Sequence, residues 1–485
     1  MRIPEQGLTK QEVFARLDAY RAHDLESHDG RALAYLYESG RRDVDEVGKQ
    51  ALALFLSKNG LDPTVFPSLL RLENEVVAMA AAHLGGGPDA AGTFTSGGTE
   101  SLILAVKTAR DYARARRPEI RHPEMVLPAT AHAAFHKAGH YLGVKPVLTP
   151  VDPVSFRADP EAMRRAITPR TILLVGSAVS YAHGVTDPIR ELGELALAHD
   201  MLLHVDGCIG GFLLPYFRRL GAPVPDFDLA VPGVSSLSMD FHKYAYAPKG
   251  ASVVLYRDAA LRRHQFYACA DWTGYAMVNA TIQSTKSGGP LAATWAVLNL
   301  VGDSGYLELA RQTLEATRAI AAGIESIPGL SLLGRPDASL LAVAGQDLSV
   351  FQVADEMRER GFYVQPQLAR HGSPPSIRLS VTAASLCQAE ALLSAFRASV
   401  AAVRAATTQD QATALWAAVE GLTSGGGSPE AFERLLALAG VTGGVLPERM
   451  ATINELLNAL PAEVTEELLL TFLNRLFSSK LEPNQ

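Results

Sequence analysis

The sequence has few cysteines, no long apolar run and no excess of basic residues. Its three cysteines, Cys208, Cys269 and Cys387, are scattered and odd in number, which excludes a disulfide framework and a cysteine-based metal site. We therefore expect a reducing compartment and a cytoplasmic protein. No run of about 18 apolar residues occurs and the N-terminal stretch is charged and polar, so we expect neither a membrane span nor a signal peptide. The net charge of −7 gives no reason to expect nucleic acid or an anionic membrane as a partner.

The composition is that of a folded enzyme with a large core. Of the 485 residues, 48% are hydrophobic and 20% are charged, which argues against disorder and favours two or three structural units. Changes in pattern divide the chain into an N-terminal helical segment (1–60), a large α/β domain (61–306), a smaller α+β domain (307–404) and a helical C-terminal extension (405–485). The glycine-rich stretch at 423–430 is a predicted linker within that extension.

Short apolar runs alternate with helical segments between residues 90 and 260. This alternation predicts an α/β fold with a largely parallel sheet and helices on both faces. In such sheets, ligands bind at the carboxyl ends of the strands. The predicted strands are 125–128, 145–149, 171–176, 201–205 and 251–256; in the smaller domain, strands are predicted within 329–345 and 361–382, and helices at 307–327, 350–360 and 386–404.

Lys243 lies beside His242 in the segment SMDFHKYAYAPKGASVVLY, just before a turn and a β-branched strand. A lone His-Lys pair is usually solvated. The interpretation changes because a glycine-rich helix start and a carboxylate at a strand end occur earlier in the chain. Together with a buried amine, these groups suit pyridoxal phosphate, since they can bind its phosphate, its ring nitrogen and its aldehyde respectively.

The glycine-rich stretch TSGGTES at 95–101 precedes a helix with an apolar stripe. Gly97 and Gly98 let the backbone approach an anion, and the amide groups of a helix start favour negative charge. Ser96 and Thr99 add hydroxyl donors. A helix start of this composition is often only an N-cap, so the motif is weak when taken alone.

Asp206 and His132 are the candidate contacts for the ring of the cofactor. Asp206 ends the predicted strand LLHVD, where its charge can keep a pyridine nitrogen protonated and make the ring an electron sink. An aspartate that only caps the following turn is the alternative. His132 opens a predicted helix and can lie over a flat ring. His136 and His140 share its helical spacing, but no H-E-x-x-H arrangement or nearby cysteine occurs, so we expect no metal site.

The order of phosphate loop, histidine, aspartate and lysine resembles that of fold-type I pyridoxal-phosphate enzymes. Within their group II decarboxylase superfamily, the chain resembles a divergent bacterial-type member of the sphingosine-1-phosphate lyase family. The motifs are NGLDPTVFPSLLRLENEVVAM, TSGGTESLILAVKTARD, LLHVDGCIGGFLLP and DFHKYAYAPKGASVVLYRD. The resemblance implies that Lys243 attaches the cofactor, Asp206 bonds its ring nitrogen and His132 stacks on the ring.

Further cofactor contacts follow from the same resemblance. Gly98, Thr99 and His242 become phosphate or cofactor contacts, and Ser177 is a weaker candidate. The resemblance also implies a homodimer with shared active sites, in which Thr285 and its neighbours contact the cofactor of the other subunit.

The chain departs from the family pattern in the 275–288 loop and near the N-terminus. Met277 stands where the family has a tyrosine, and a thioether cannot shuttle a proton, so Tyr275 becomes an alternative source of that hydroxyl. Lys286 stands where the family has an arginine. Asp62 stands where the family often has Asn or His, and a carboxylate there would repel an anionic substrate.

The resemblance implies a carbon–carbon lyase that cleaves a phosphorylated amino alcohol to an aldehyde and a small amine. A pyridoxal-phosphate-dependent amino-acid decarboxylase is the alternative. Arg378, on the strand SIRLSVT, is then a candidate fork for a substrate carboxylate, although a solvated arginine is the simpler interpretation. The altered 275–288 loop also permits a homologue that binds the cofactor with weak or no catalysis.

Overall fold

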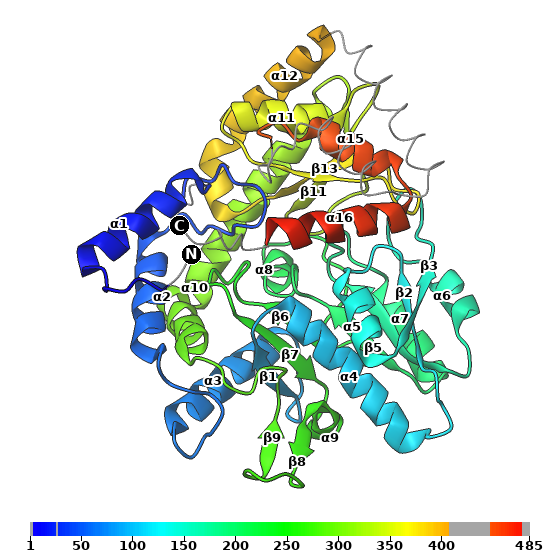
Figure 1. Cartoon of the computed structure of the whole chain (residues 1–485). Coiled ribbons are helices and arrows are strands. Elements are labelled where there is room, and N and C mark those ends of the chain that lie inside the picture. The colour runs from blue at the N-terminus through cyan, green and yellow to red at the C-terminus, as the bar shows by residue number, and fades with distance from the viewer. Residues whose placement is uncertain (1–2, 26–27, 407–446, 478–485) are drawn as a thin grey trace.

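A computed structural model describes residues 3–25, 28–406 and 447–477 of the chain (Figure 1). A seven-stranded sheet is the centre of a large domain, and a four-stranded antiparallel sheet is the centre of a smaller one. The long helix α10 (Gly289–Glu325) packs against elements of both. The predicted α/β class, with a mostly parallel sheet between helices, is confirmed.

The strands of the large sheet run in the order β1-β7-β6-β5-β4-β2-β3. The strands from β6 to β3 are parallel to one another, whereas β7 is antiparallel to both β1 and β6. Strands β1 and β6 were not predicted, because their sequences AGTFT and VSSLSMD lack a continuous β-branched or apolar run. The bounds are β1 Ala91–Thr95, β2 Glu124–Pro128, β3 Lys145–Thr149, β4 Thr171–Ser177, β5 Leu202–Asp206, β6 Val234–Asp240 and β7 Ser252–Tyr256.

Successive side chains of the strands point to opposite faces of this sheet. Leu173 and Val175 on β4 pack with Phe135 of α5, whereas Leu174, between them, packs with Leu192 of α7. Helices α4 and α5 therefore cover one face, and α6 and α7 cover the other. The helices of the domain are α3 Pro67–His83, α4 Gly98–Arg116, α5 Ala134–Leu142, α6 Pro160–Ala166, α7 Ile189–Ala198, α8 Leu214–Arg219 and α9 Ala259–Arg262; a hairpin of β8 Tyr267–Cys269 and β9 Met277–Asn279 follows.

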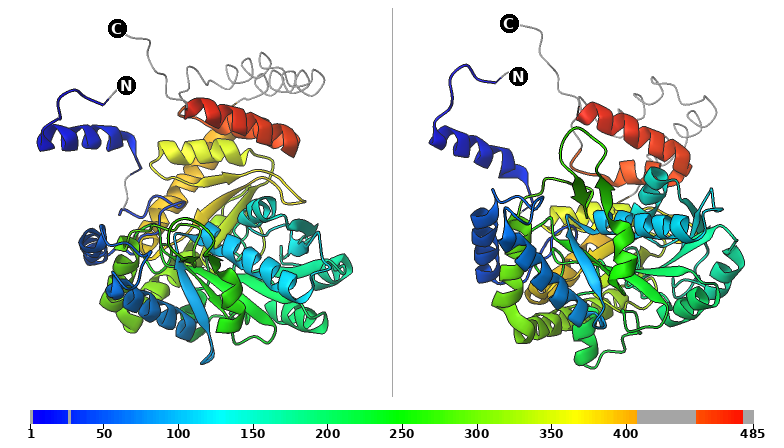
Figure 2. Two further views of the ribbon diagram at one scale, coloured as in Figure 1. Left: turned by 60° about the horizontal axis from the view of Figure 1, so that its bottom comes forward. Right: turned by 90° about the horizontal axis from the view of Figure 1, so that it is seen from below.

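The expectation of helix throughout residues 1–60 is wrong. Helix α1 (Lys10–Tyr20) stands off the body of the molecule (Figure 2), and α2 (Arg42–Phe55) packs on α10. Between them Gly30 adopts a φ of 72°, and a Cβ at this position would lie 2.5 Å from the carbonyl oxygen of Ala384. The chain after Gly30 runs instead along the small sheet, where Leu33 N–H donates to the carbonyl of Tyr363.

The small domain is built from the strands and helices predicted for it. Its sheet runs in the order β10-β11-β13-β12. Helix α12 lies in a stretch, Ala383–Ala405, that is long and apolar enough by composition alone to cross a membrane, but its Leu392 and Phe396 are buried in the core of the domain. The bounds are β10 Leu330–Leu332, β11 Leu340–Gly345, β12 Gln365–Gln367, β13 Ser376–Ser380, α11 Val350–Glu359 and α12 Ala389–Ala405.

Helix α10 starts earlier than the predicted helix at 307–327, and the expected domain boundary at residue 306 lies inside it. Gly302, with φ 62° and ψ 172°, interrupts its helical backbone. This conformation is strained for residues with a Cβ, so a glycine marks the bend.

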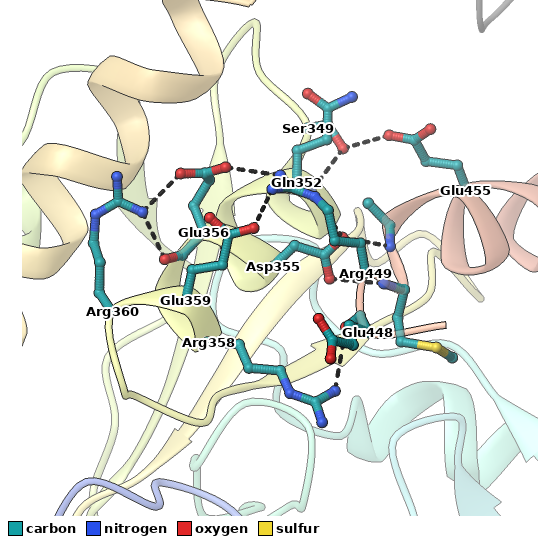
Figure 3. Close-up of polar contacts among 12 residues, drawn as sticks. Ser349, Gln352, Asp355, Glu356, Arg358, Glu359, Arg360, Glu448, Arg449 and Glu455 are labelled. Carbon is teal, nitrogen blue, oxygen red and sulfur yellow. Dashed lines mark hydrogen bonds and ion pairs between the residues drawn. The ribbon is translucent and has the colours of Figure 1, made fainter. Parts of the chain in front are cut away.

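Two helices of the C-terminal extension, α15 (Ala451–Ala459) and α16 (Ala462–Leu476), lie within the described residues. The predicted linker at 423–430 lies outside them. Asp355 of α11 accepts hydrogen bonds from the backbone N–H groups of Met450 (2.9 Å) and Ala451 (2.8 Å), and so caps α15 from another domain (Figure 3). At the other end of α15, Arg370 donates to the carbonyl of Leu457 (3.1 Å). Both ends of α15 are thus held by the small domain.

Replacement of Asp355 by alanine should loosen the C-terminal helices. The change leaves two N–H groups at the start of α15 without an acceptor, which costs about 1–3 kcal/mol of local stability. Hydrogen exchange over residues 447–477 should quicken accordingly. Glu359→Ala is the matched control, since Glu359 lies on the same helix and pairs with the Arg449 side chain at the surface. Equal exchange in the two variants would contradict the assigned capping role.

Candidate active site

Four loops meet at the carboxyl edge of the large sheet, after β1, β2, β5 and β6. They surround a cavity of about 420 Å³. Its lining includes the predicted Lys243, Asp206, His132 and His242, together with Gly97–Thr99 of the phosphate loop. The fold therefore brings groups from four separate segments into one place.

Lys243 forms a buried ion pair that was not predicted. Its Nζ lies 2.9 Å from Oδ2 of Asp240, the last residue of β6. Burial is the largest single effect and opposes the charge of the ammonium, but the Asp240 carboxylate, with smaller contributions from Tyr37 and Cys208, raises the pKa of Lys243 above its usual value. The same lysine, with His242, lowers the pKa of Asp240 although burial acts to raise it. The i, i+3 spacing within DFHK was the only sequence signal for this pair.

Asp206 ends β5 and projects toward α4 and α5. Its Oδ1 accepts hydrogen bonds from Cys208 N–H (3.0 Å) and from the Ser238 hydroxyl (3.5 Å). The hydrogen bond from Cys208 N–H shows that Asp206 does cap the turn that follows β5, which was the alternative to a role in cofactor binding. The carboxylate nevertheless lines the cavity, so the local contact and the predicted role are compatible.

The start of α4 lies directly against Asp240 and Cys208, which line the same cavity. Gly97 is its N-cap residue, and the N–H groups of the first turn have no partners within the helix. A Cβ on Gly98 would lie 2.9 Å from both Asp240 Oδ2 and Cys208 Sγ, so only glycine permits this approach. Ser96 also lines the cavity, where its N–H (2.7 Å) and hydroxyl (2.8 Å) both donate to Glu100.

His132 lies just before α5 rather than within it. Its Nδ1 accepts the N–H of Ala134 at 3.1 Å, which leaves Nε2 as the protonated nitrogen of the neutral ring. Burial lowers the pKa of His132 and so favours that neutral form. The ring meets Tyr181 edge to face, with centroids 5.5 Å apart.

Arg378 is not the solvated strand arginine that was the simpler expectation. It is only 1% exposed and lines the cavity from β13. Its Cζ lies 3.8 Å from the ring centroid of Tyr181, and its Nη1 donates to Ser380 at 3.1 Å. Among the residues that the structure describes, no carboxylate pairs with this guanidinium, so a buried cation faces the cavity.

Three further lining residues escaped the sequence analysis. Tyr35 and Tyr37 come from the N-terminal segment, which has no catalytic motif, and Lys249 was quoted only as part of APKG. Lys249 Nζ donates to the carbonyl of Tyr35 (2.9 Å) and lies 5.2 Å from the ring centroid of Tyr37. Burial, followed by repulsion from Lys243, lowers the pKa of Lys249.

Several predicted residues line a different cavity, of about 490 Å³, which shares Ser96 and Glu100 with the first. Asp62 lies there, exposed, and accepts the N–H (2.8 Å) and hydroxyl (2.6 Å) of Thr64. Thr285 and Lys286 also line this cavity, and Lys286 Nζ lies 3.8 Å from Glu73. Within one subunit, these three side chains do not meet Lys243.

Tyr275 and Ser177 lie outside both cavities. Tyr275 is 57% exposed beside the β8–β9 hairpin, so within its own subunit it is no substitute for the tyrosine that Met277 replaces. Ser177 is buried at the end of β4, in register with Asp206, and its N–H donates to Asp187 at 2.8 Å. The described residues contain no cluster of three or more side chains able to hold a metal.

Comparisons with known proteins agree with this site. The pyridoxal-dependent decarboxylase conserved domain matches residues 35–340, and a C-terminal putative HTH domain of pyridoxal-dependent enzymes matches residues 410–475. A sphingosine-1-phosphate lyase of Oryza sativa subsp. japonica is 41% identical over 83% of this chain and 75% of the relative. The chain belongs to the sphingosine-1-phosphate lyase family.

Two other relatives place this lyase homologue within the wider group. The sphingosine-1-phosphate lyase structure of Burkholderia pseudomallei K96243 covers 87% of this chain and 97% of that one, at 35% identity and a TM-score of 0.79. A probable L-aspartate decarboxylase of Pyrococcus furiosus is 32% identical over 75% of this chain and 94% of the relative. The protein is a pyridoxal-phosphate-dependent lyase.

The segment that matches the C-terminal putative HTH domain is acidic. Acidic side chains outnumber basic ones across residues 410–475, which disfavours contact between this segment and a nucleic-acid backbone.

The cavity of this lyase homologue fits pyridoxal phosphate. Lys243 lines it together with the aspartate and histidine that would bracket a pyridine ring, and the start of α4 brings free N–H groups to the same cavity, where they can bind a phosphate. His242 directs Nδ1–H at the carbonyl of Ala251 (2.7 Å), and its Nε2 lies 3.6 Å from Oδ2 of Asp240.

Gly98→Ala should weaken cofactor binding by about 10-fold or more, since the added methyl group forces α4 away from Asp240 and the cost of one such clash exceeds about 1.4 kcal/mol. Fluorescence titration of the cofactor-free protein with pyridoxal phosphate measures the effect. Gly87→Ala is the control, because a Cβ there has no neighbour within 4 Å. Unchanged affinity in Gly98→Ala would show that α4 does not form the cofactor wall.

Proposed function

We propose that the protein is a carbon–carbon lyase of the sphingosine-1-phosphate lyase type, which cleaves a phosphorylated amino alcohol to an aldehyde and a small amine. The observation that carries the proposal is one cavity that holds Lys243, Asp206, His132 and the start of α4 together with two further cations. Seven sphingosine-1-phosphate lyase relatives at 35–42% identity support the choice of reaction.

Each residue of the cavity has a distinct task in this proposal. Lys243 would bind the aldehyde of the cofactor, and Asp206 would keep the ring nitrogen protonated. His132, neutral and fixed by Ala134 N–H, would lie over the ring. The first turn of α4 and His242 would hold the phosphate. When bound, pyridoxal phosphate supplies an electron-accepting ring.

Lys249 and Arg378 would recognise the anionic group of the substrate. Arg378 is buried and Lys249 is exposed, and both line the cavity together with Tyr35, Tyr37 and Tyr181. A buried cation without a carboxylate partner is costly, so a bound phosphate or carboxylate would stabilise Arg378, and Lys249 would add a second positive charge beside it. Tyr35 and Tyr37 also bring hydroxyl groups into the cavity, where the 275–288 loop of the same subunit brings none. Burial raises the pKa of Tyr35 to about 12, so this hydroxyl stays protonated at neutral pH.

An amino-acid decarboxylase is the second candidate. It is favoured by Arg378, whose planar guanidinium is fixed by Ser380 and by Gln365, which also accepts the Tyr181 hydroxyl at 2.9 Å. Such a fork suits a carboxylate held next to the ring. The relative from Pyrococcus furiosus supports the same alternative.

We further propose a homodimer with shared active sites. Thr285 and Lys286 line a cavity that meets the lysine cavity only through Ser96 and Glu100. Glu100 Oε1 accepts the N–H of Ile282 at 2.8 Å, so the loop is fixed at the surface beside the phosphate loop. From that position it would contact the cofactor of a neighbouring subunit.

A product assay separates the two reactions. Holoenzyme incubated with a phosphorylated long-chain amino alcohol should release an aldehyde, whereas carbon dioxide from the common amino acids should stay at the level of Lys243→Ala, the inactive control. Lys249→Ala should lower turnover of the phosphorylated substrate by about 10- to 100-fold, the scale of a lost charge-assisted contact. Carbon dioxide without aldehyde would assign the protein to the decarboxylases.

Shared sites predict complementation between inactive variants. Lys243→Ala and an inactivating variant of Lys286 should regain activity when mixed under conditions of subunit exchange. Random pairing gives half mixed dimers with one intact site each, so about a quarter of normal activity is expected. Sedimentation provides the control for assembly. An active monomer would refute the shared site.

A further inference from the structure

Asp240 lies between the lysine and the helix start. Its Oδ2 is 2.9 Å from Lys243 Nζ and 3.6 Å from His242 Nε2. A Cβ on Gly98 would lie 2.9 Å from the same oxygen. The residue is 2% exposed, and among the described residues its Oδ1 has no hydrogen-bond partner. A buried carboxylate thus touches both the amine and the helix start expected to bind the cofactor.

The charges around Lys243 come from several elements. Asp240 on β6 is the principal counter-ion, and burial is the principal opposing effect. Lys249 repels the ammonium, while Asp240 attracts both lysines. Among the described residues, the other titratable groups around Lys243 are Tyr37 of the N-terminal segment, Asp206 at the end of β5, Cys208 after it, His132 before α5 and His242. Asp240, in direct contact at 2.9 Å, is therefore the principal group that favours the charged form of Lys243.

Attachment of pyridoxal phosphate joins the Lys243 nitrogen to the aldehyde carbon and releases one water molecule. The reaction needs the nitrogen lone pair, so the ammonium must first lose a proton to solvent. We propose that Asp240 is a positioning residue that holds Lys243 as an ammonium in the cofactor-free protein and thereby limits the rate of cofactor attachment. The proposal rests on Lys243 as the attachment residue.

The rate of attachment tests this directly. Cofactor-free protein is mixed with pyridoxal phosphate between about pH 6.5 and 8.5, and attachment is followed by absorbance. For wild type we expect the rate to rise about tenfold per pH unit, because the neutral fraction of an amine rises by that factor below its pKa. Asp240→Asn should be about tenfold faster or more at neutral pH, with a flatter profile. Asp240→Glu, which keeps the carboxylate, should keep the steep profile.

Two controls make the outcome specific. Asp228→Asn changes another largely buried aspartate, which pairs with Arg218 at 3.3 Å and does not line the cavity, and it should leave the rate unchanged. Pyridoxal, which lacks the phosphate, is the second probe. A similar gain with both aldehydes supports the proposal. A gain with pyridoxal phosphate alone would mean that Asp240 repels the phosphate, and would overturn it.

Two further results would also overturn the proposal. A wild-type attachment rate that does not change with pH would overturn it, even if Asp240→Asn failed to fold. Borohydride reduction followed by peptide mass spectrometry reports the attachment site separately. A pyridoxyl group on another lysine would refute the Lys243 assignment itself, whereas a labelled Lys243 with unchanged Asp240→Asn kinetics would refute only the role of Asp240.

Discussion

Buried charge at the carboxyl edge of the large sheet is the constraint on which the rest of the structure depends. Lys243, Asp240, Asp206 and Arg378 are all largely removed from water. Each buried charge costs several kcal/mol unless a partner or hydrogen bonds offset that cost. The ion pair of Lys243, the amide and hydroxyl donors to Asp206 and the Tyr181 ring beneath Arg378 supply those partners.

This need for partners ties three parts of the chain together. The large domain supplies Lys243 and the helix start, the small domain supplies Arg378, and the N-terminal segment supplies Tyr35 and Tyr37. That segment runs along the small sheet, where the carbonyl of Leu33 accepts the N–H of Ser380, and the hydroxyl of the same serine accepts a hydrogen bond from Arg378. The cavity of Lys243 therefore has its full lining only when the large domain, the small domain and the N-terminal segment are packed together. Folding of the small domain is thus required to place Arg378 beside Lys243.

The second cavity, which Thr285 and Lys286 line, adjoins the cavity of Lys243. Glu100 connects it to the lysine cavity through hydrogen bonds to Ser96 on one side and to Ile282 on the other. One buried carboxylate thus holds both the surface loop and the phosphate loop. The C-terminal helices are held in a comparable way, by Asp355 and Arg370 at the two ends of α15.

The sequence by itself determined the fold class, the cofactor and the family, because apolar periodicity and ordered motifs such as TSGGTES and DFHKYAYAPKG are local properties of the chain. It could not predict the extended segment after Gly30, since a close approach to Ala384 decides that conformation. It also missed Tyr37 and Lys249, and misjudged Arg378. Only the tertiary structure decided which side chains share the cavity of Lys243 and which, like Lys286, face another, because burial and ion pairing depend on contacts between segments distant in the chain.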